Sequence, residues 1–499
     1  MSEAVSVPVA PGRGRWREHA PLLVVVAVGG LVRLATMIAY RPAFEFVQDS
    51  FNYLYNADHL RPEVIRPIGY PVLLRLLSVA DPHFRVVPIM QHLLGLAAGV
   101  LLYAVLRRLG AGRWLGAAGA APLLLDGYQV AVEHFVLSET LFEALFVAAF
   151  ALLLWRVSPG WLAAGASGLL LAAGTLTRTN GLVLLVPALG YLLLRRVRLP
   201  VVAVFLAAAA LPLGGYATWF HAVHGKYGIV AYDGYFLTGR VSPFADCSHL
   251  MLTSAEKLLC DPRPVAHRPG PDFFVWSPAS PLRRPQVPPG TDRDAVARSY
   301  ARKVILAQPL DYLQAVGVDL LHYVAPGRST ALQDGPAKTL VFPTALRTGT
   351  FAPESSPRDP YVWAFTWPGK VVQNGRIPAS HGFHDRQITP GQSLGLARSL
   401  RAYQSVVYGA GPALGLCVLL ALLAAAYRFG SAPRRLVAGA LLLGGSAVLI
   451  WLLPSATASF DYRYTLPTLA LAPTGAVLGV LALRSPRPQA DAGPVQAQR

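Results

Sequence analysis

Long apolar runs separated by short polar turns dominate both ends of this chain. Runs of about 18 or more apolar residues are typical of membrane-spanning helices, and shorter ones can belong to the same bundle. The pattern predicts an all-α polytopic membrane protein with about ten transmembrane helices. The expected spans cover residues 21–40, 84–106, 115–125, 135–155, 161–176, 181–194, 199–220, 403–427, 436–453 and 466–483.

The middle of the chain, residues 221–398, has a different character. It is rich in Pro, Gly, Arg and aromatic residues, and it contains no apolar run long enough to cross a membrane. Within it, Asp294 to Val324 has helical spacing and predicts surface helices broken at Pro309. A connection of this length far exceeds ordinary loops, so we expect a large mixed insertion or lid.

These runs divide the chain into five parts. Residues 21–220 form the expected transmembrane core, with a first outer loop at 41–83, and residues 399–484 hold the C-terminal spans. Residues 1–20 are polar and predict a disordered N-terminus, while 485–499 form a basic tail. A basic start before an apolar run also fits a signal peptide. No convincing cleavage site follows, so we expect an uncleaved first span.

Composition supports a membrane protein and argues against nucleic-acid binding. The chain is 54% hydrophobic and only 14% charged, with a mean hydropathy of +0.43. The net charge of +18 could suggest a nucleic-acid partner, but no such motif is visible. Many of the Arg residues instead lie at the ends of apolar runs. The expected partner is therefore the lipid bilayer and not nucleic acid.

The basic clusters also predict an orientation. With the N-terminus in the cytoplasm, every basic cluster in a short turn next to a span falls on the cytoplasmic side. Both termini are then cytoplasmic, and loop 41–83 and the insertion lie outside. The residues concerned are Arg107, Arg108, Arg113, Arg156, Arg195, Arg196, Arg198, Arg428, Arg434, Arg435, Arg484 and Arg487.

Two of the three cysteines share one polar loop. If the loop containing Cys247 and Cys260 is extracytoplasmic, the pair could form a disulfide worth about 3 kcal/mol. Two unpaired thiols are the alternative. Cys417 lies within an apolar run and is expected to be packing.

Residues 48–71, directly after the first span, carry the best candidate chemistry. Asp49 is a candidate base, and Arg66 opens a run that is apolar on one face. An acid followed by a cation at a membrane surface suits chemistry on a phosphate-bearing lipid. The alternative is an amphipathic connector whose charges are merely solvated.

Four cations near the outer span ends are not explained by orientation: Arg33, Arg66, Arg178 and Arg463. A cation in the apolar zone costs about 2.5–3.5 kcal/mol, so something should offset that cost. One candidate is a phosphate or carboxylate gripped by the guanidinium groups. The other is an internal ion pair, for example of Arg463 with Asp461. Convergence of several cations on one outer site would favour the phosphate.

Acids and histidines at the start of the fourth span are further candidates. Glu139 could orient a substrate hydroxyl or brace Arg178. His134 beside Glu133 resembles a fragment of a metal site, but no ligand spacing follows, so no metal is expected. Phosphate-binding, dinucleotide-binding and serine-hydrolase motifs are also absent from the sequence, which predicts no cofactor.

Several short motifs follow one another along the chain. They are Asp49, Tyr53, the run Arg66-Pro67-Ile68-Gly69-Tyr70-Pro71, Ser138-Glu139, Arg178 with Gly181, and Arg463, Tyr464 and Pro467. Together these residues resemble the GT-C glycosyltransferases, polytopic enzymes that use polyprenyl-phosphate sugars and include protein O-mannosyltransferases and aminoarabinose transferases. The sequence departs from the family in two places, since Gln48 stands where many members have a second acid and Arg66 replaces a Lys.

The resemblance implies an inverting transfer of a sugar, mannose or a pentose, from a polyprenyl-phosphate donor to an acceptor hydroxyl at the outer face. Asp49 would be the base. Arg66, with Arg178 or Arg463, would hold the donor phosphate. The residues expected to position substrate are Tyr53, Tyr70, Glu139 and His134. The insertion would bind or select the acceptor.

Two other functions stay open at this point. The chain could be a transporter or flippase for a lipid-linked or anionic solute, with the Arg residues forming a path. No internal repeat is visible and the charges cluster on one side, which opposes this reading. The chain could also be an inactive scaffold whose insertion binds partners.

Overall fold

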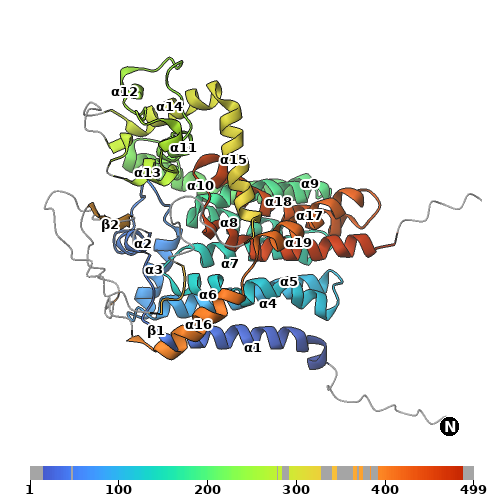
Figure 1. The fold of residues 1–499 in the computed structure, drawn as a ribbon. Coiled ribbons are helices and arrows are strands. Elements are labelled where there is room, and N and C mark those ends of the chain that lie inside the picture. The colour runs from blue at the N-terminus through green and yellow to red at the C-terminus, as the bar shows by residue number, and fades with distance from the viewer. Residues whose placement is uncertain are drawn as a thin grey trace, which may run out of the picture.

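The computed structural model is almost entirely helical (Figure 1). It describes residues 15–46, 49–277, 279–283, 291–326, 340–344, 363–367, 370–374, 383 and 391–486. The predictions made for residues 1–14 and 487–499 lie outside this part of the chain, as does Gln48.

Each of the ten predicted runs corresponds to helical structure. The first seven are α1 (Arg15–Ala39), α4 (Val86–Arg108), α5 (Arg113–Leu125), α7 (Glu139–Trp155), α8 (Trp161–Thr177), η1 with α9 (Thr179–Leu184 and Leu185–Leu194) and α10 (Leu199–His224). The last three are α16 with α17 (Leu394–Val406 and Gly411–Tyr427), α18 (Arg434–Thr457), and η4 with α19 (Tyr462–Thr465 and Leu466–Arg484).

Length and composition support a multi-pass membrane protein. Five described helices are long and apolar enough to cross a membrane, or up to seven if each bent pair counts as one span. One such pair is α16 and α17, which meet at 46°. The predicted helical polytopic class is therefore confirmed. The number ten stays a prediction, because several of the helices are shorter than a full span.

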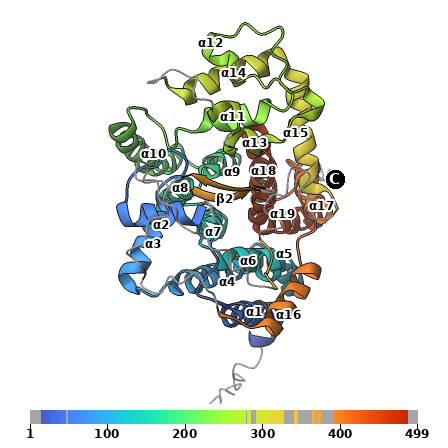
Figure 2. The ribbon, with the colours of Figure 1, turned by 60° about the vertical axis from the view of Figure 1, so that its left-hand side comes forward.

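Helix α19 lies in the middle of the bundle between α17, α18 and α5 (Figure 2). Its residues from Leu466 to Gly479 are buried. At Gly479 a Cβ would lie 3.0 Å from the Leu420 carbonyl oxygen, so a larger residue would push α17 slightly away. Peripheral helices such as α10 instead expose leucines, as lipid-facing helices do: Leu199 is 76% and Leu211 is 75% exposed.

Arg side chains from three different turns meet at one end of the bundle. Arg108 and Arg435 both donate to the Trp155 carbonyl oxygen, Arg435 at 2.9 Å. Arg195 donates to the carbonyl oxygen of Val157, in the turn that follows α7. These contacts place three of the predicted basic turns on the same side of the bundle, as the alternation of spans requires.

Short elements from several parts of the chain lie at the opposite end of the bundle (Figure 1). They are α2 (Asp49–His59), α3 (Gly69–Ala80), α6 (Gly127–His134), and the strands β1 (Tyr40–Arg41) and β4 (Gly391–Gln392), which pair antiparallel. Asp126 caps α6 by accepting from the backbone N–H groups of Tyr128 and Gln129, both at 2.8 Å. The hydropathy pattern did not predict α6 as a separate helix.

The described part of the insertion contains both helices and strands. Its elements are α11 (Asp233–Val241), α12 (Ser254–Lys257), η2 (Val265–His267), α13 (Pro271–Trp276), η3 (Pro281–Arg283), α14 (Arg293–Ala307), α15 (Pro309–Val324) and the antiparallel pair β2 (Trp363–Trp367) and β3 (Lys370–Asn374). Helices α11 to α14 gather beyond one end of the bundle (Figure 1).

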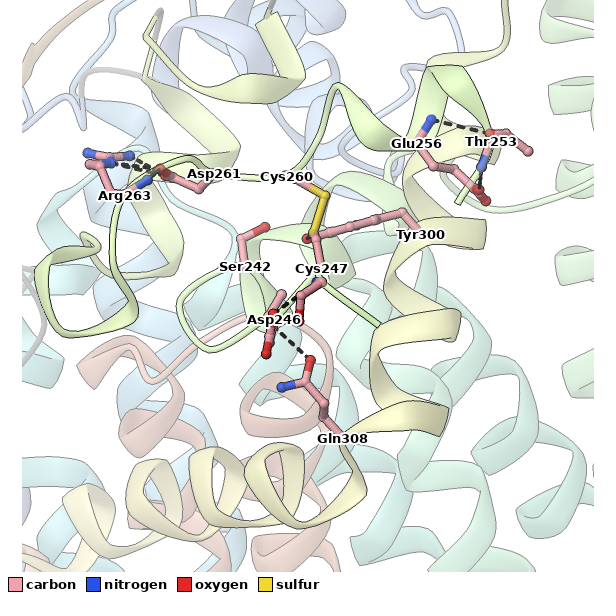
Figure 3. Close-up of a disulfide and its surroundings, with 12 residues drawn as sticks. Ser242, Asp246, Cys247, Thr253, Glu256, Cys260, Asp261, Arg263, Tyr300 and Gln308 are labelled. Carbon is pink, nitrogen blue, oxygen red and sulfur yellow. Dashed lines mark hydrogen bonds and ion pairs between the residues drawn. A yellow bond between two sulfur atoms is a disulfide. The ribbon is translucent and has the colours of Figure 1, made fainter. Parts of the chain in front are cut away.

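A disulfide joins Cys247 and Cys260 within this group (Figure 3). The bond lies beside Tyr300 of α14, and α14 contributes much of the small core of the insertion. Of the two alternatives for these cysteines, the structure has the bonded one. Cys417 is a free, half-buried thiol in α17.

Helix α15 lies at the surface as expected, but one of its faces packs against the bundle, which the sequence did not predict. The chain does bend by 100° between α14 and α15, at the predicted break before Pro309. However, α15 packs against α17 and α18, and it buries Asp319 and Tyr323. Its opposite face exposes Leu310 and Leu321 at 79% and 66%. The reason is that α15 is apolar on both faces, so one side covers the bundle while the other stays uncovered.

Candidate active site

Asp49 is the first residue of α2, and backbone contacts fix its position. The chain just before it forms a parallel bridge, in which Phe44 N–H donates to the His134 carbonyl at 2.9 Å. Just after it, the Ser50 hydroxyl donates to the Val136 carbonyl at 2.8 Å. An acid in the first turn also suits the positive end of a helix. The segment from His134 to Val136 thus holds Asp49 from both sides.

Two guanidinium groups bracket the Asp49 carboxylate. Arg66 contacts Oδ1, and Nη1 of Arg463 lies 2.6 Å from Oδ2. Asp49 is only 6% exposed. Arg463 is 414 positions away in the sequence, so the fold brings the outer loop and the last span together at this carboxylate.

The two cations decide the protonation state of Asp49. Burial by itself would raise the pKa of this carboxyl, but the charges of Arg66 and Arg463 outweigh burial and hold the pKa well below its usual range. Asp49 is therefore ionised at physiological pH.

A second carboxylate lies next to the first. Glu139, the first residue of α7, has its Oε1 2.6 Å from Nη1 of Arg178 and 3.5 Å from Nη1 of Arg463. Arg463 also lies 3.1 Å from Asp461, through Nε. Arg463 thus contacts three carboxylates. The expected ion pairs of Arg463 with Asp461 and of Arg178 with Glu139 exist. The cations also converge on one site, the arrangement that favours a phosphate ligand, and phosphate binding stays a prediction.

Aromatic side chains line this cluster. The Tyr53 hydroxyl shares a hydrogen bond with Ser138 Oγ at 2.9 Å, and the Arg66 guanidinium carbon lies 5.9 Å from the Tyr53 ring centre. Burial, and then the negative charge of Asp49, raise the pKa of Tyr53 to about 12. Arg463 lies 4.9 Å from the ring centre of Phe46. These rings exclude water and strengthen the charge interactions.

Three of the expected residues lie away from the cluster. Tyr70 is behind Tyr53, where its hydroxyl donates to Gln91 at 2.9 Å. Arg33 was grouped with the outer cations, but it forms a two-fold ion pair with Glu133, at 2.7 Å for each bond. His134 is fully buried beside His92, with 3.4 Å between their ring nitrogens. It points into the bundle because α6 ends there and the chain turns.

Two acids at the site escaped the sequence-based prediction. Glu63 accepts from the backbone N–H of Arg66 at 2.7 Å and so fixes the loop that carries this cation. Its position three residues before Arg66 is a local signal that could have been used. Asp272 of α13 comes from the insertion. Burial, and then the charge of Asp461, raise the pKa of Asp272 to about 6. Nothing in the local sequence marks Asp272.

Among the described residues, no group of three or more His, Cys, Asp or Glu side chains is arranged to hold a metal ion. The candidate site itself consists of carboxylates and guanidinium groups in contact with one another. Such an arrangement can accept a proton from a hydroxyl and can stabilise a phosphate anion.

Comparisons with known proteins give limited similarity. No family model and no curated protein sequence matches the chain. Among solved structures, it is similar to the protein O-mannosyltransferase Pmt1–Pmt2 complex of S. cerevisiae bound to the sugar donor, with 15% identity and a TM-score of 0.33 over 48% of this chain and 37% of that one. The oligosaccharyltransferase of Archaeoglobus fulgidus gives 12% identity and a TM-score of 0.43, over 94% of this chain and 50% of that one.

A third structure is ArnT from Cupriavidus metallidurans bound to undecaprenyl phosphate, with 15% identity and a TM-score of 0.31 over 93% of this chain and 78% of that one. The chain thus spans half or less of the length of the first two proteins. These similarities are too weak to carry an argument about activity, which is therefore built on the geometry of the site.

Proposed function

We propose that this protein is a membrane glycosyltransferase that moves a sugar from a polyprenyl-phosphate carrier to an acceptor hydroxyl. The observation that carries the proposal is the Asp49 carboxylate held between Arg66 and Arg463, beside the pair of Glu139 and Arg178. An ionised carboxylate can take a proton from a hydroxyl, and guanidinium groups can hold a phosphate through paired hydrogen bonds.

The reaction would proceed as a single displacement. The acceptor oxygen attacks the anomeric carbon from the face opposite the phosphate, so the configuration inverts, and Asp49 takes the hydroxyl proton. The bond from the anomeric carbon to the phosphate oxygen breaks, and the polyprenyl phosphate leaves as an anion. Arg66 and Arg463 stabilise the charge that develops on this leaving group.

The ion pairs suggest how the base becomes available. With both carboxylate oxygens facing guanidinium groups, a hydroxyl must compete with Arg66 and Arg463 for Asp49. A donor phosphate shared by these two cations would draw them from the carboxylate and make Asp49 more basic. Tyr53 would position the donor, as the resemblance implies. Glu139 would brace Arg178, with which it forms an ion pair.

We place the site on the outer side of the membrane. The basic turns around Arg108, Arg195 and Arg435 meet at one end of the bundle, and the positive-inside rule makes that end cytoplasmic. A disulfide in the insertion fits an oxidising compartment. Both termini would then be cytoplasmic, and the insertion would meet the acceptor outside. A mannosyl or pentosyl donor is the expectation from the resemblance.

The rival function is a transporter or flippase, and one observation bears on it. Charged side chains do lie deep in the bundle, but Arg33 and Glu133 there are bound to each other and Glu133 is also bound to His92, with side-chain exposures of 6% or less. A translocation path needs charges that can exchange partners. A liposome flux assay tests this, since passage of a lipid-linked sugar with no transfer would favour the rival.

The decisive experiment compares Asp49→Asn with Asp81→Asn in a sugar-transfer assay with a panel of polyprenyl-phosphate sugars. Asp81 is an exposed carboxylate of the same outer loop and serves as the control. We expect Asp49→Asn to stay in the membrane and to lose transfer, while Asp81→Asn keeps it. Wild-type turnover by Asp49→Asn would remove this residue from the mechanism.

A further inference from the structure

One buried ion pair joins the insertion to the membrane bundle. Arg240 of α11 contacts Asp319 of α15 through Nη1 and Oδ2, and the two side chains are 5% and 1% exposed. Helix α15 runs from the group around α11 and α14 to the bundle helices α17 and α18 (Figure 2). The pair therefore lies where the insertion meets the bundle.

Asp319 makes a second contact that leads toward the site. Its Oδ2 accepts a hydrogen bond from the backbone N–H of Phe460 at 2.9 Å. Phe460 belongs to the turn after α18, and its ring lies 4.6 Å from that of Tyr323. A carboxylate that accepts from both a guanidinium and a backbone N–H fixes that turn strongly.

The next residue of the same turn holds Arg463. Asp461 caps η4 by accepting from the backbone N–H of Arg463 at 2.8 Å, and it also contacts Nε at 3.1 Å. Arg463 in turn reaches Asp49 at 2.6 Å. Only the peptide unit between Phe460 and Asp461 thus separates the Asp319 contact from the residue that orients Arg463.

Arg66, the other cation on Asp49, is held in a different way. Glu63 accepts from its backbone N–H, and the Val64 carbonyl of the same loop accepts from Ala231 N–H at 2.8 Å. None of these contacts involves Asp319. The two cations on one carboxylate therefore have separate supports, which provides an internal control.

We propose that Asp319, held by Arg240, is a positioning residue that sets the place of the Arg463 guanidinium against Asp49. The insertion then acts on Arg463 through Asp319, whereas Arg66 depends on Glu63 and on the contact of its loop with Ala231. The catalytic meaning of this inference rests on the proposed function, whereas its structural part does not.

A double-mutant cycle on thermal stability of the full chain in lipid nanodiscs tests the structural part. If Asp319 positions Arg463, the Tm shifts of Asp319→Ala and Arg463→Ala will not add in the double variant, because each removes what the other supports. The shifts of Asp319→Ala and Arg66→Ala will add. Additive shifts in both cycles, or equal coupling in both, would overturn the inference whether or not the chain transfers sugar.

A conservative variant and a matched control complete the cycle. Asp319→Asn keeps an oxygen that can accept from Phe460 N–H but loses the charge facing Arg240. Its coupling energy with Arg463→Ala should therefore be smaller than that of Asp319→Ala. Arg298→Ala breaks ion pairs with Asp233 and Asp294 within the insertion and should couple to neither cation. Coupling of Arg298→Ala to Arg463 as large as that of Asp319→Ala would contradict the specific role.

The pH profile of transfer tests the catalytic part. Arg463 depresses the pKa of Asp49. Displacement of Arg463 should raise that pKa, so that Asp49 becomes protonated and stops acting as a base at a higher pH than in the wild type. Asp319→Ala should therefore move the acid limb upward by about one unit or more. An unchanged limb with fewer active molecules would mean a merely structural role. Absence of transfer by the wild type refutes the proposed function and leaves the stability cycle to decide the positioning role.

Discussion

Two buried clusters of acids and cations, which we call the inner and the outer cluster, differ in how their cations are paired. In the inner cluster, Arg33 binds both oxygens of Glu133 at 2.7 Å and also the Leu124 carbonyl at 2.7 Å, and the side chains of the pair are 3% and 0% exposed. In the outer cluster, Arg463 is divided among three carboxylates and is 13% exposed. The guanidinium of Arg33 thus has all its hydrogen bonds to fixed partners. That of Arg463 is shared among several carboxylates and is partly exposed.

The comparison teaches that a cation in an apolar zone is not a functional signal by itself. Arg33 has fixed partners, and nothing remains for a substrate to bind. Arg463 has several partners at unequal distances, so an incoming anion can replace one of them at low cost. The inner cluster still serves the outer one, because Gln91 binds the backbone of Glu133 and Phe135 and so holds the segment leading to Glu139.

The largest expected effect breaks the inner cluster. Arg33→Ala removes the guanidinium partner of Glu133 and leaves this buried carboxylate with His92 and Gln129, which should destabilise the fold by about 3–5 kcal/mol. Thermal unfolding in lipid nanodiscs would measure this. The double variant Arg33→Ala with Glu133→Ala should lose less than Arg33→Ala alone. A small effect of Arg33→Ala would show that the fold does not depend on the Arg33–Glu133 pair.

A smaller effect in the outer cluster separates donor from acceptor. Arg66→Ala should lower transfer about 10²-fold, close to 3 kcal/mol, mostly by weakening use of the donor. Arg66→Lys keeps the charge but not the two-pronged geometry and should fall between the wild type and Arg66→Ala. Titrations of each substrate would measure the difference. Equal loss for donor and acceptor would contradict a phosphate role for Arg66.

The smallest effect concerns pH and Asp272. Because the folded-state pKa of Asp272 is raised to about 6, its contribution to stability is present below the unfolded value and is lost as pH rises through about 6. Asp272→Asn should therefore raise the Tm more at pH 7.5 than at pH 5, and the gain in unfolding free energy at pH 7.5 should be at most about 3 kcal/mol. Equal Tm gains at both pH values would indicate that Asp272 does not titrate in this range.

Much of the fold could be predicted from the sequence because hydropathy is a local property. The apolar runs marked the helices, and the Arg clusters marked turns that do meet at one end. Helix α6 and the packing of α15 were missed, since an apolar segment looks the same whether it spans, re-enters or covers a bundle. The 100° bend at Pro309 was signalled, but the surface that α15 would cover was not.

The site was partly predictable for a related reason. Asp49 and Arg463 could be assigned to one side of the membrane, yet their contact across 414 positions depends on the packing of α19 against its neighbours. His134 stands close to Glu139 in the sequence, but the turn after α6 sends it toward His92. Asp272 comes from a region without a motif, so only the folded chain brings it near Asp461.

The most direct test of the central claim is an experimental structure with a polyprenyl phosphate bound. We expect the phosphate oxygens within hydrogen-bonding distance of Arg66 and of Arg463 or Arg178, with the Asp49 carboxylate released from at least one guanidinium. A phosphate bound elsewhere, with Asp49 still paired to both Arg66 and Arg463, would contradict the account.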